Sequence, residues 1–258
     1  MKIWVHCKKC FEETGNNALA SYPVDIIEEP VLDFTCPNGH NSKYHFQKVK
    51  YQFLFESSFR ALIDGYYMEA VLGFTASLER FYEFFCKFVC IKNGLGVEGF
   101  LGTWKLVTKQ SERQLGAFLF LYLLENKSHF DSKKYNFEVL KTFRNKVIHN
   151  GYLPSEKETI DYGDGVFEII KNISVEIAIK DPEFFHSITN EEMFDRKIYK
   201  KHPDALSMGM STFLAVPYVP ETMLGKNFRE EFTINKAKCV DYKTSKLVET
   251  LLQMKSSN

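Results

Sequence analysis

Two short motifs near the N-terminus combine cysteine and histidine at spacings typical of metal sites. The first is Cys7-x-x-Cys10, and the second is a Cys-Pro-Asn-Gly-His run that joins Cys36 to His40. Zinc in proteins prefers four thiolate or imidazole ligands in a tetrahedron, and each motif presents two such ligands from one tight turn. The motifs therefore predict a structural Zn²⁺ ion bound by Cys7, Cys10, Cys36 and His40 in a module similar to a zinc ribbon.

The identity of the fourth ligand stays open at this stage, because a ribbon more usually has a fourth cysteine. His6 and His45 lie close to the two motifs in the sequence and are the alternatives to His40. Four protein ligands leave no open coordination position, so the predicted ion is structural rather than catalytic. Cys86 and Cys90 are four residues apart on a predicted helix, and we interpret them as core residues because no further ligands accompany them.

A second group of residues could do acid–base chemistry. Arg144, Asn145 and His149 lie at the end of a predicted helix that has a local excess of positive charge. Arginine offers a fixed cation for phosphate, and histidine can both accept and donate a proton near neutral pH. Five residues correspond to about 500° of helical rotation, so Arg144 and His149 do not share a face of an ideal helix, whereas Asn145 and His149 do.

These residues, with the helices around them, resemble the HEPN family of ribonucleases. The family motif is Arg-x(4–6)-His, often with a polar residue directly after the arginine, and Arg144-Asn145-x-x-x-His149 matches it. The resemblance covers residues 47–180 and includes Glu79 on the second predicted helix. It implies a homodimer with a composite site, in which an RNA 2′-hydroxyl attacks the neighbouring phosphate without a catalytic metal.

The resemblance also implies a role for each residue of the motif. His149 would be the general acid or base, Arg144 would stabilise the charged phosphorane, Asn145 would position one of them, and Glu79 would orient Arg144. Many family members are toxins or antiviral effectors, so the chain is expected to be an endoribonuclease of that kind. Others only bind, and the alternative is a non-catalytic module for nucleic-acid or protein binding and dimerisation, with a regulatory partner left open.

A second arginine–histidine match runs from Arg196 to His202. We discount it as a catalytic motif because His202 precedes Pro203 and because the segment lies outside the predicted bundle. A metal-dependent enzyme at the cysteine motifs is a further alternative, but four protein ligands argue against it.

The hydrophobic periodicity predicts the elements that must hold these groups. Short strands are expected at Tyr22–Ile27 and Val31–Thr35, and a Gly-rich loop at Gly94–Gly102. Helices are expected from about Gln47 to Ile63, and over Tyr66–Ile91, Ser111–Glu125, Lys134–His149 and Ser155–Ile179. Beyond Lys180 the sequence predicts a strand at Thr212–Val219 and a terminal helix at Lys243–Met254.

The fold class is therefore mainly α. An antiparallel helical bundle at residues 47–180 is preceded by a small zinc ribbon at residues 1–46 and followed by a mixed C-terminal extension at residues 181–258. The 33 basic and 33 acidic residues give no net charge, which argues against a general coat for nucleic acid. No apolar signal segment or membrane span is evident, so a cytoplasmic protein with reduced cysteines is expected.

Overall fold

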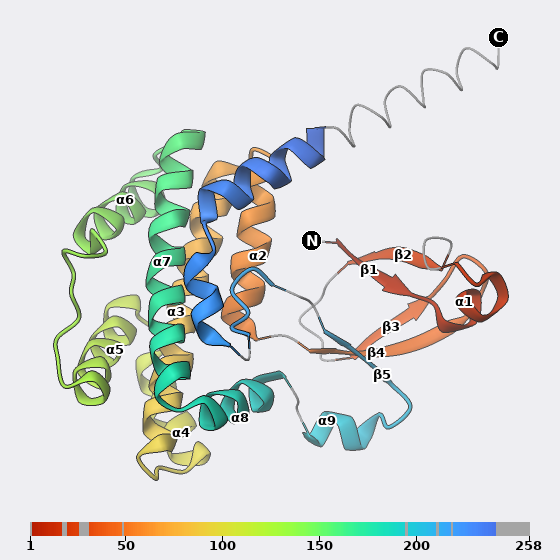
Figure 1. Ribbon diagram of the computed structural model, residues 1–258, viewed down its shortest axis with the longest axis horizontal. Coiled ribbons are helices and arrows are strands. Elements are labelled where there is room, and N and C mark those ends of the chain that lie inside the picture. The colour runs from red at the N-terminus through yellow and green to blue at the C-terminus, as the bar shows by residue number, and fades with distance from the viewer. Residues whose placement is uncertain are drawn as a thin grey trace. The chain divides into compact units, whose positions relative to one another are not determined.

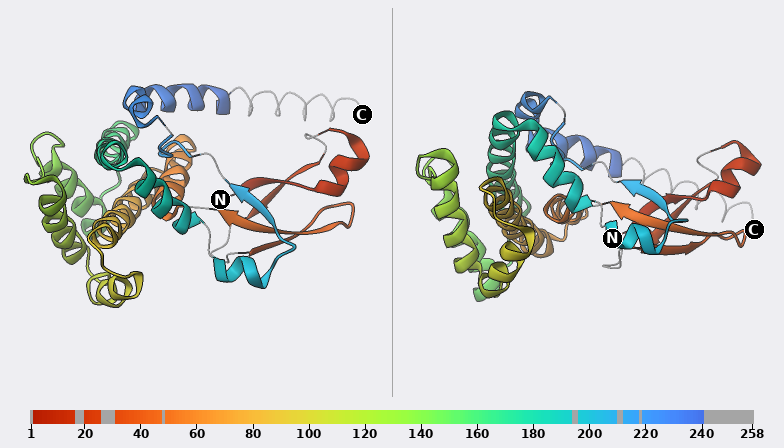
Figure 2. Two further views of the ribbon diagram at one scale, coloured as in Figure 1. Left: turned by 60° about the horizontal axis from the view of Figure 1, so that its bottom comes forward. Right: turned by 90° about the horizontal axis from the view of Figure 1, so that it is seen from below.

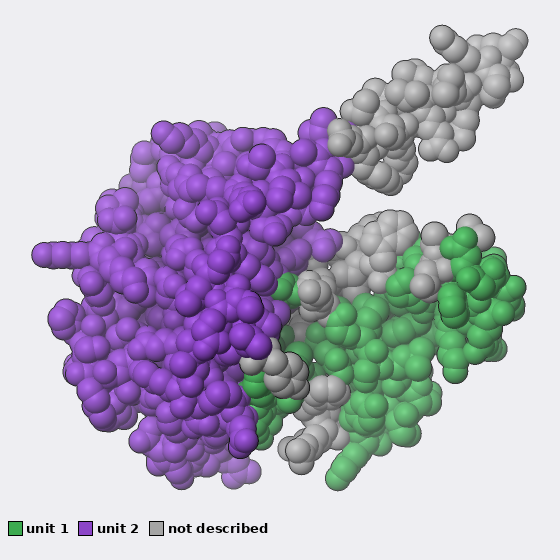
Figure 3. All heavy atoms as spheres, viewed as in Figure 1, with its two compact units in different colours: residues 1–50, 186–212 green, residues 51–185, 213–258 purple. Residues whose placement is uncertain are grey.

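The computed structural model describes residues 2–16, 20–25, 31–47, 49–193, 196–209, 212–217 and 219–240. The described part of the chain is mainly helical and divides into two compact units, which Figure 3 distinguishes by colour. Unit 1 comprises residues 1–50 and 186–212, and unit 2 comprises residues 51–185 and 213–258. Among the described residues, no helix is long and apolar enough to cross a lipid bilayer.

The division of the chain corrects the expected domains. The segment after residue 180 is not an independent extension, because one part of it joins unit 1 and the other joins unit 2. The reason is pairing: β5 (Leu206–Gly209) adds to the N-terminal sheet as a parallel strand beside β4 (Asn41–Gln47). A short segment without a core of its own gains backbone hydrogen bonds in this way.

The described residues of unit 1 form two small sheets, the helices α1 and α9, and the second part of α8 (Pro182–Met193). The two-stranded sheet pairs β1 (Lys2–His6) with β2 (Ser21–Asp25), and the three-stranded sheet has the order β3 (Val31–Thr35), β4, β5. The first helix, α1 (Lys8–Thr14), follows β1, and α9 (Arg196–Lys201) precedes β5 (Figure 1). The expected strand at Val31–Thr35 is confirmed, and the expected strand at Tyr22–Ile27 corresponds to β2 over its described residues.

The core of unit 1 surrounds its cysteines. Alternate residues of β3, Leu32 and Phe34, are buried beside Tyr44 of β4 and the partly buried Met208 of β5. Cys7, Cys10 and Cys36 belong to the same small cluster of buried residues. Such a small apolar core supplies little stability, so a bound metal ion would contribute much of it.

Unit 2 is built on two long helices, α3 (Tyr67–Lys92) and α7 (Glu156–Lys180), which pack against each other (Figure 2). Unit 2 also contains several further helices. These are α2 (Lys50–Ile63), α4 (Val97–Val107), α5 (Ser111–Asn126), α6 (Phe137–Asn150), the first part of α8 (Pro182–Met193) and the 3₁₀ helix η1 (Pro220–Gly225). Residues 228–240 are also helical. The five helices expected between residues 47 and 180 are confirmed to within a few residues.

Aromatic rings fill the centre of unit 2. Phe55 of α2, Phe74 of α3 and Phe167 of α7 surround Phe228, and the rings of Phe55 and Phe74 lie 4.9 Å apart. All four side chains are buried. The C-terminal segment that carries Phe228 is therefore part of the core of unit 2.

The Gly-rich loop expected at Gly94–Gly102 is wrong beyond Gly96, because α4 begins at Val97. Gly96 caps the N-terminus of α4, and Phe100 and Trp104, one turn apart, are buried and stack at 5.6 Å. Burial of these two rings outweighs the weak helix propensity of Gly99 and Gly102, which costs about 1 kcal/mol per residue.

Two glycines of α7 lie at points of close packing. A side chain at Gly163 would come within 2.7 Å of the Phe228 ring, and one at Gly165 within 2.7 Å of Leu140. Both glycines therefore allow close helix packing. Ser155 and Glu158 form a capping box that starts α7.

The strand expected at Thr212–Val219 is wrong. The described residues of Thr212–Val219 form turns and irregular chain rather than a strand, while α8, α9 and β5 were not predicted. β5 pairs with β4, which lies far away in the sequence, so local periodicity could not identify β5 as a strand. The expected helix at Lys243–Met254 lies outside the described residues.

Candidate functional site

The four predicted metal ligands converge in unit 1. One ligand atom from each of Cys7, Cys10, Cys36 and His40 lies within 4.8 Å of every other, and this cluster could hold a metal ion. The Sγ atom of Cys10 is 3.6 Å from that of Cys36 and 3.3 Å from Nδ1 of His40. The three cysteines are buried and His40 is partly exposed. Three soft sulfurs and one imidazole are a donor set that fits zinc.

Local structure explains how the two motifs reach each other. Cys7 caps the N-terminus of α1 and Cys10 lies in its first turn. Cys36 and His40 close a tight turn between β3 and β4, in which the Cys36 N–H donates to the His40 carbonyl at 2.9 Å. Gly39 has a φ of +82°, a conformation that this turn requires and that glycine adopts without strain.

His6 and His45 do not join the cluster. Nδ1 of His6 is hydrogen-bonded to the Ser21 hydroxyl at 2.8 Å, and Nε2 of His45 donates to the carbonyl of His202 at 3.0 Å. His40 is therefore the histidine of the site, and its Nε2 atom lies 3.4 Å from a carboxylate oxygen of Glu13.

Polar neighbours favour a thiolate at Cys10. The Tyr22 hydroxyl donates to its Sγ atom at 3.4 Å and the Asn38 amide donates at 3.3 Å. The hydrogen bond from Tyr22 is the main cause that lowers the pKa of Cys10 to about 6, whereas burial raises the pKa of Cys7. Metal binding needs deprotonated sulfur, so these donors assist the arrangement.

Cys86 and Cys90 belong to α3, away from any cluster of metal ligands among the described residues. Burial raises the pKa of Cys86 far above that of a free thiol. This thiol stays protonated and packs as a core residue, as its position on the apolar stripe predicts.

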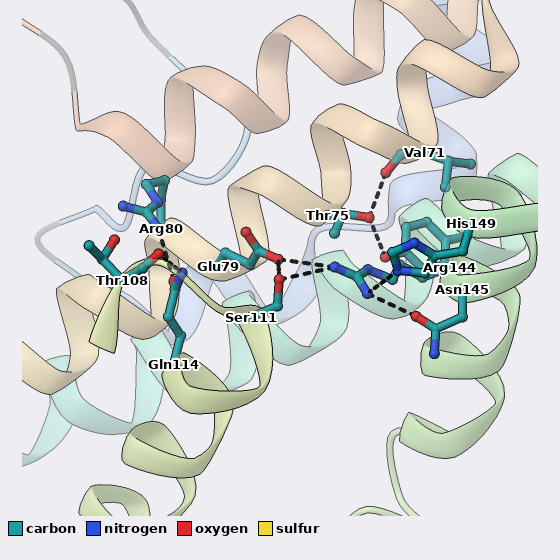
Figure 4. A network of polar contacts seen from close by, with 11 residues as sticks. Val71, Thr75, Glu79, Arg80, Thr108, Ser111, Gln114, Arg144, Asn145 and His149 are labelled. Carbon is teal, nitrogen blue, oxygen red and sulfur yellow. Dashed lines mark hydrogen bonds and ion pairs between the residues drawn. The ribbon is translucent and has the colours of Figure 1, made fainter. Parts of the chain in front are cut away.

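The second candidate site lies on α6 of unit 2. Nη1 of Arg144 donates to Oδ1 of Asn145 at 2.8 Å and lies 3.4 Å from Nε2 of His149 (Figure 4). Arginine has only donors, so Nε2 of His149 is the acceptor in this contact. Arg144 and His149 do not share a face of an ideal helix, but the long arginine side chain reaches along α6 to its last turn and brings the two groups together.

The other side of the guanidinium is held by two further helices. Nη2 of Arg144 lies 3.4 Å from Oε1 of Glu79 on α3, and it donates to the Ser111 hydroxyl on α5 at 3.0 Å. The Ser111 hydroxyl in turn donates to Oε1 of Glu79 at 2.5 Å. The side chains of Arg144 and Glu79 are 15% and 23% exposed, so this ion pair is partly shielded from water.

Ser111 is the residue that the sequence reasoning missed. The sequence indicates Ser111 only as the start of the predicted helix at Ser111–Glu125, a position where serine is common. The structure directs its hydroxyl toward Glu79 and Arg144, whereas the N-cap of α5 is Gln110 (Figure 4). No sequence signal links Ser111 to residues 32 and 33 positions away.

A neighbouring polar network fixes the start of α5. Arg80 donates to Oε1 of Gln114 at 2.9 Å, and the Gln114 amide donates to the Thr108 carbonyl at 2.8 Å. Gln114 is buried, so these bonds are shielded from competing water. The network stabilises the chain on both sides of Ser111.

The exposed end of α6 presents the acid–base group. His149 is exposed one residue before the end of α6, and Gly151, which has a φ of +64°, caps the helix. Lys146 lies with its Nζ atom 3.3 Å from the centre of the Tyr152 ring. An immobilised cation, an amide and an accessible imidazole thus meet at one surface, where they could bind an anion and transfer a proton.

The second arginine–histidine match takes no part in this arrangement. Arg196 and His202 belong to unit 1, and the carbonyl of His202 accepts the hydrogen bond from His45.

Comparison with known proteins gives no match: no protein-family model matches this chain, and neither the curated proteins nor the solved structures contain a significant match.

Proposed function

We propose that unit 2 is an HEPN-like endoribonuclease that cleaves RNA without a catalytic metal ion. The observation that carries the proposal is the contact between Arg144 and His149, with the guanidinium held by Glu79 and Ser111. A positioned cation beside an accessible imidazole is the equipment that transesterification at phosphorus needs. Glu79, which pairs with Arg144 and Ser111, is engaged in positioning rather than in metal binding.

In the proposed reaction the RNA 2′-oxygen forms a bond to the adjacent phosphorus. The 2′-hydroxyl proton passes to a base, the bond from phosphorus to the 5′-oxygen breaks, and that oxygen receives a proton from an acid. The products are a 2′,3′-cyclic phosphate and a 5′-hydroxyl end. His149 is the residue proposed to exchange the proton, and its Nε2 atom lies 3.4 Å from Nη1 of Arg144.

Arg144 stabilises the additional negative charge of the phosphorane, and Asn145 holds one edge of the guanidinium. The resemblance further proposes a homodimer, in which the histidine of a second copy supplies the complementary acid or base. A toxin or antiviral role belongs to the same proposal.

The decisive experiment is cleavage of end-labelled single-stranded RNA and transfer RNA by the zinc-loaded full chain in EDTA. We expect wild type to leave 2′,3′-cyclic phosphate ends, and we expect His149→Ala to lower the rate by about 10²–10⁴-fold, the usual contribution of general acid–base catalysis. His129→Ala is the matched control, because His129 is also an exposed histidine of unit 2.

Zinc content is measured before and after the assay, so that loss of the structural ion is not mistaken for a catalytic requirement. Equal cleavage by wild type and His149→Ala would refute the proposal. RNA binding without cleavage by wild type would instead favour the non-catalytic binding and dimerisation module.

A further inference from the structure

Helix α9 of unit 1 is strongly basic in a protein without net charge. Its six residues run from Arg196 to Lys201, and four of them are arginine or lysine. Lys200 and Lys201 are exposed, and Asp204 is the acidic residue that follows them most closely in the sequence. The positive charges of Lys200 and Lys201 are therefore available to an anionic partner.

One aromatic ring is fixed within this basic segment. Tyr199 stacks on the ring of His45 with a centroid distance of 4.8 Å and an interplanar angle of 17°. His45 is only 8% exposed and is anchored through Nε2 to the His202 carbonyl, whereas Tyr199 is 43% exposed. His45 thus supports one face of Tyr199, and the exposed part of the tyrosine ring is held in place.

A purely structural role does not account for this combination. Lysines in the last turn stabilise a helix through its dipole by about 0.3–1 kcal/mol, and that effect needs no aromatic neighbour. A braced, exposed aromatic ring next to exposed cations is instead the arrangement with which proteins hold single-stranded nucleic acid: bases stack on the ring and phosphates pair with the cations.

We propose that α9 is an RNA-docking site, in which Tyr199 stacks on a nucleobase and Lys200 and Lys201 bind the flanking phosphates. The choice of RNA as the ligand rests on the proposed function of unit 2. The site would also give the metal-binding module a purpose, because β4 of that module carries His45, which braces Tyr199.

The test measures binding of a fluorescent single-stranded RNA to the full chain by anisotropy, in a His149→Ala background that prevents cleavage. In K200A/K201A we expect weaker binding. The negative slope of the logarithm of the association constant against the logarithm of the salt concentration should become less steep by about 1.4, since each phosphate contact on a single strand contributes about 0.7. K105A/K109A is the control, because both lysines are exposed on unit 2.

The aromatic contribution is tested separately. Tyr199→Ala is expected to weaken binding by about 5- to 100-fold with little change in the salt slope, while Tyr199→Phe retains the affinity. Tyr66→Ala removes another exposed tyrosine and serves as the control. Zinc content and the far-UV circular dichroism of each variant show whether unit 1 is still folded.

Unchanged affinity and salt slope in both K200A/K201A and Tyr199→Ala would overturn the docking site, whether or not the protein cleaves RNA. Conversely, a wild-type chain that binds RNA through α9 but does not cleave it would refute the proposed function and leave the docking site standing. Cleavage by wild type with the same KM in the α9 variants would refute the docking site alone.

Discussion

Ser111 offers the sharpest test of how the guanidinium of Arg144 is positioned. Its hydroxyl donates to Glu79 at 2.5 Å and accepts from Arg144 at 3.0 Å, so Ser111→Ala removes two charge-assisted hydrogen bonds. Each is worth about 1.5–3 kcal/mol when shielded. Both bonds share one hydroxyl, and Arg144 and Glu79 remain paired at 3.4 Å, so we expect a total loss of about 1.5–2 kcal/mol.

The assay combines stability and catalysis. For a unit of this size a loss of 1.5–2 kcal/mol lowers Tm by about 3–8 °C, which differential scanning calorimetry resolves. We also expect kcat for RNA cleavage to fall about tenfold, because the guanidinium loses one of its anchors. Ser111→Thr keeps the hydroxyl and is expected to retain most of both properties.

Ser128→Ala is the matched control, because Ser128 is an exposed serine that follows α5 in the same unit. A general effect of removing a hydroxyl would appear in both variants. The same Tm and the same kcat in Ser111→Ala and Ser128→Ala would refute the role of Ser111 in positioning Arg144.

Two further predictions concern the metal site and helix packing. Removal of the ion with a strong chelator should unfold unit 1. Cys36→Ser should abolish the thiolate-to-metal absorption of the Co²⁺-substituted protein, whereas Cys90→Ser should keep this absorption. Co²⁺ spectra that are alike in both variants would contradict the site. Gly163→Ala should destabilise unit 2 by about 1–3 kcal/mol, because its methyl group would meet the Phe228 ring at 2.7 Å. Gly116→Ala lies in open space on α5 and should stabilise unit 2 by about 0.5–1 kcal/mol. Urea denaturation measures both free energies of unfolding, and equal effects would show that the close approach at Gly163 is unimportant.

The sequence by itself determined the features that depend on local spacing. The apolar periodicity from residue 50 to 180 identifies five of the six helices of that region, all except α4, because burial of one helix face imposes a repeat of about 3.6 residues. The Cys7–Cys10 and Cys36–His40 pairs identify the cluster that could hold a metal ion, because each pair lies within one turn. In the same way, the neighbouring positions of Arg144 and Asn145 indicate a polar group on α6.

Tertiary structure alone decided the features that join distant segments. His40 rather than His6 or His45 completes the cluster, because the fold gives the other two histidines different hydrogen-bond partners. Ser111 joins Glu79 and Arg144 only because three helices meet at one point. The pairing of β5 with β4 likewise brings residues from opposite ends of the chain together. Long-range packing has no repeat within a single segment, so these contacts could not be derived from local sequence patterns.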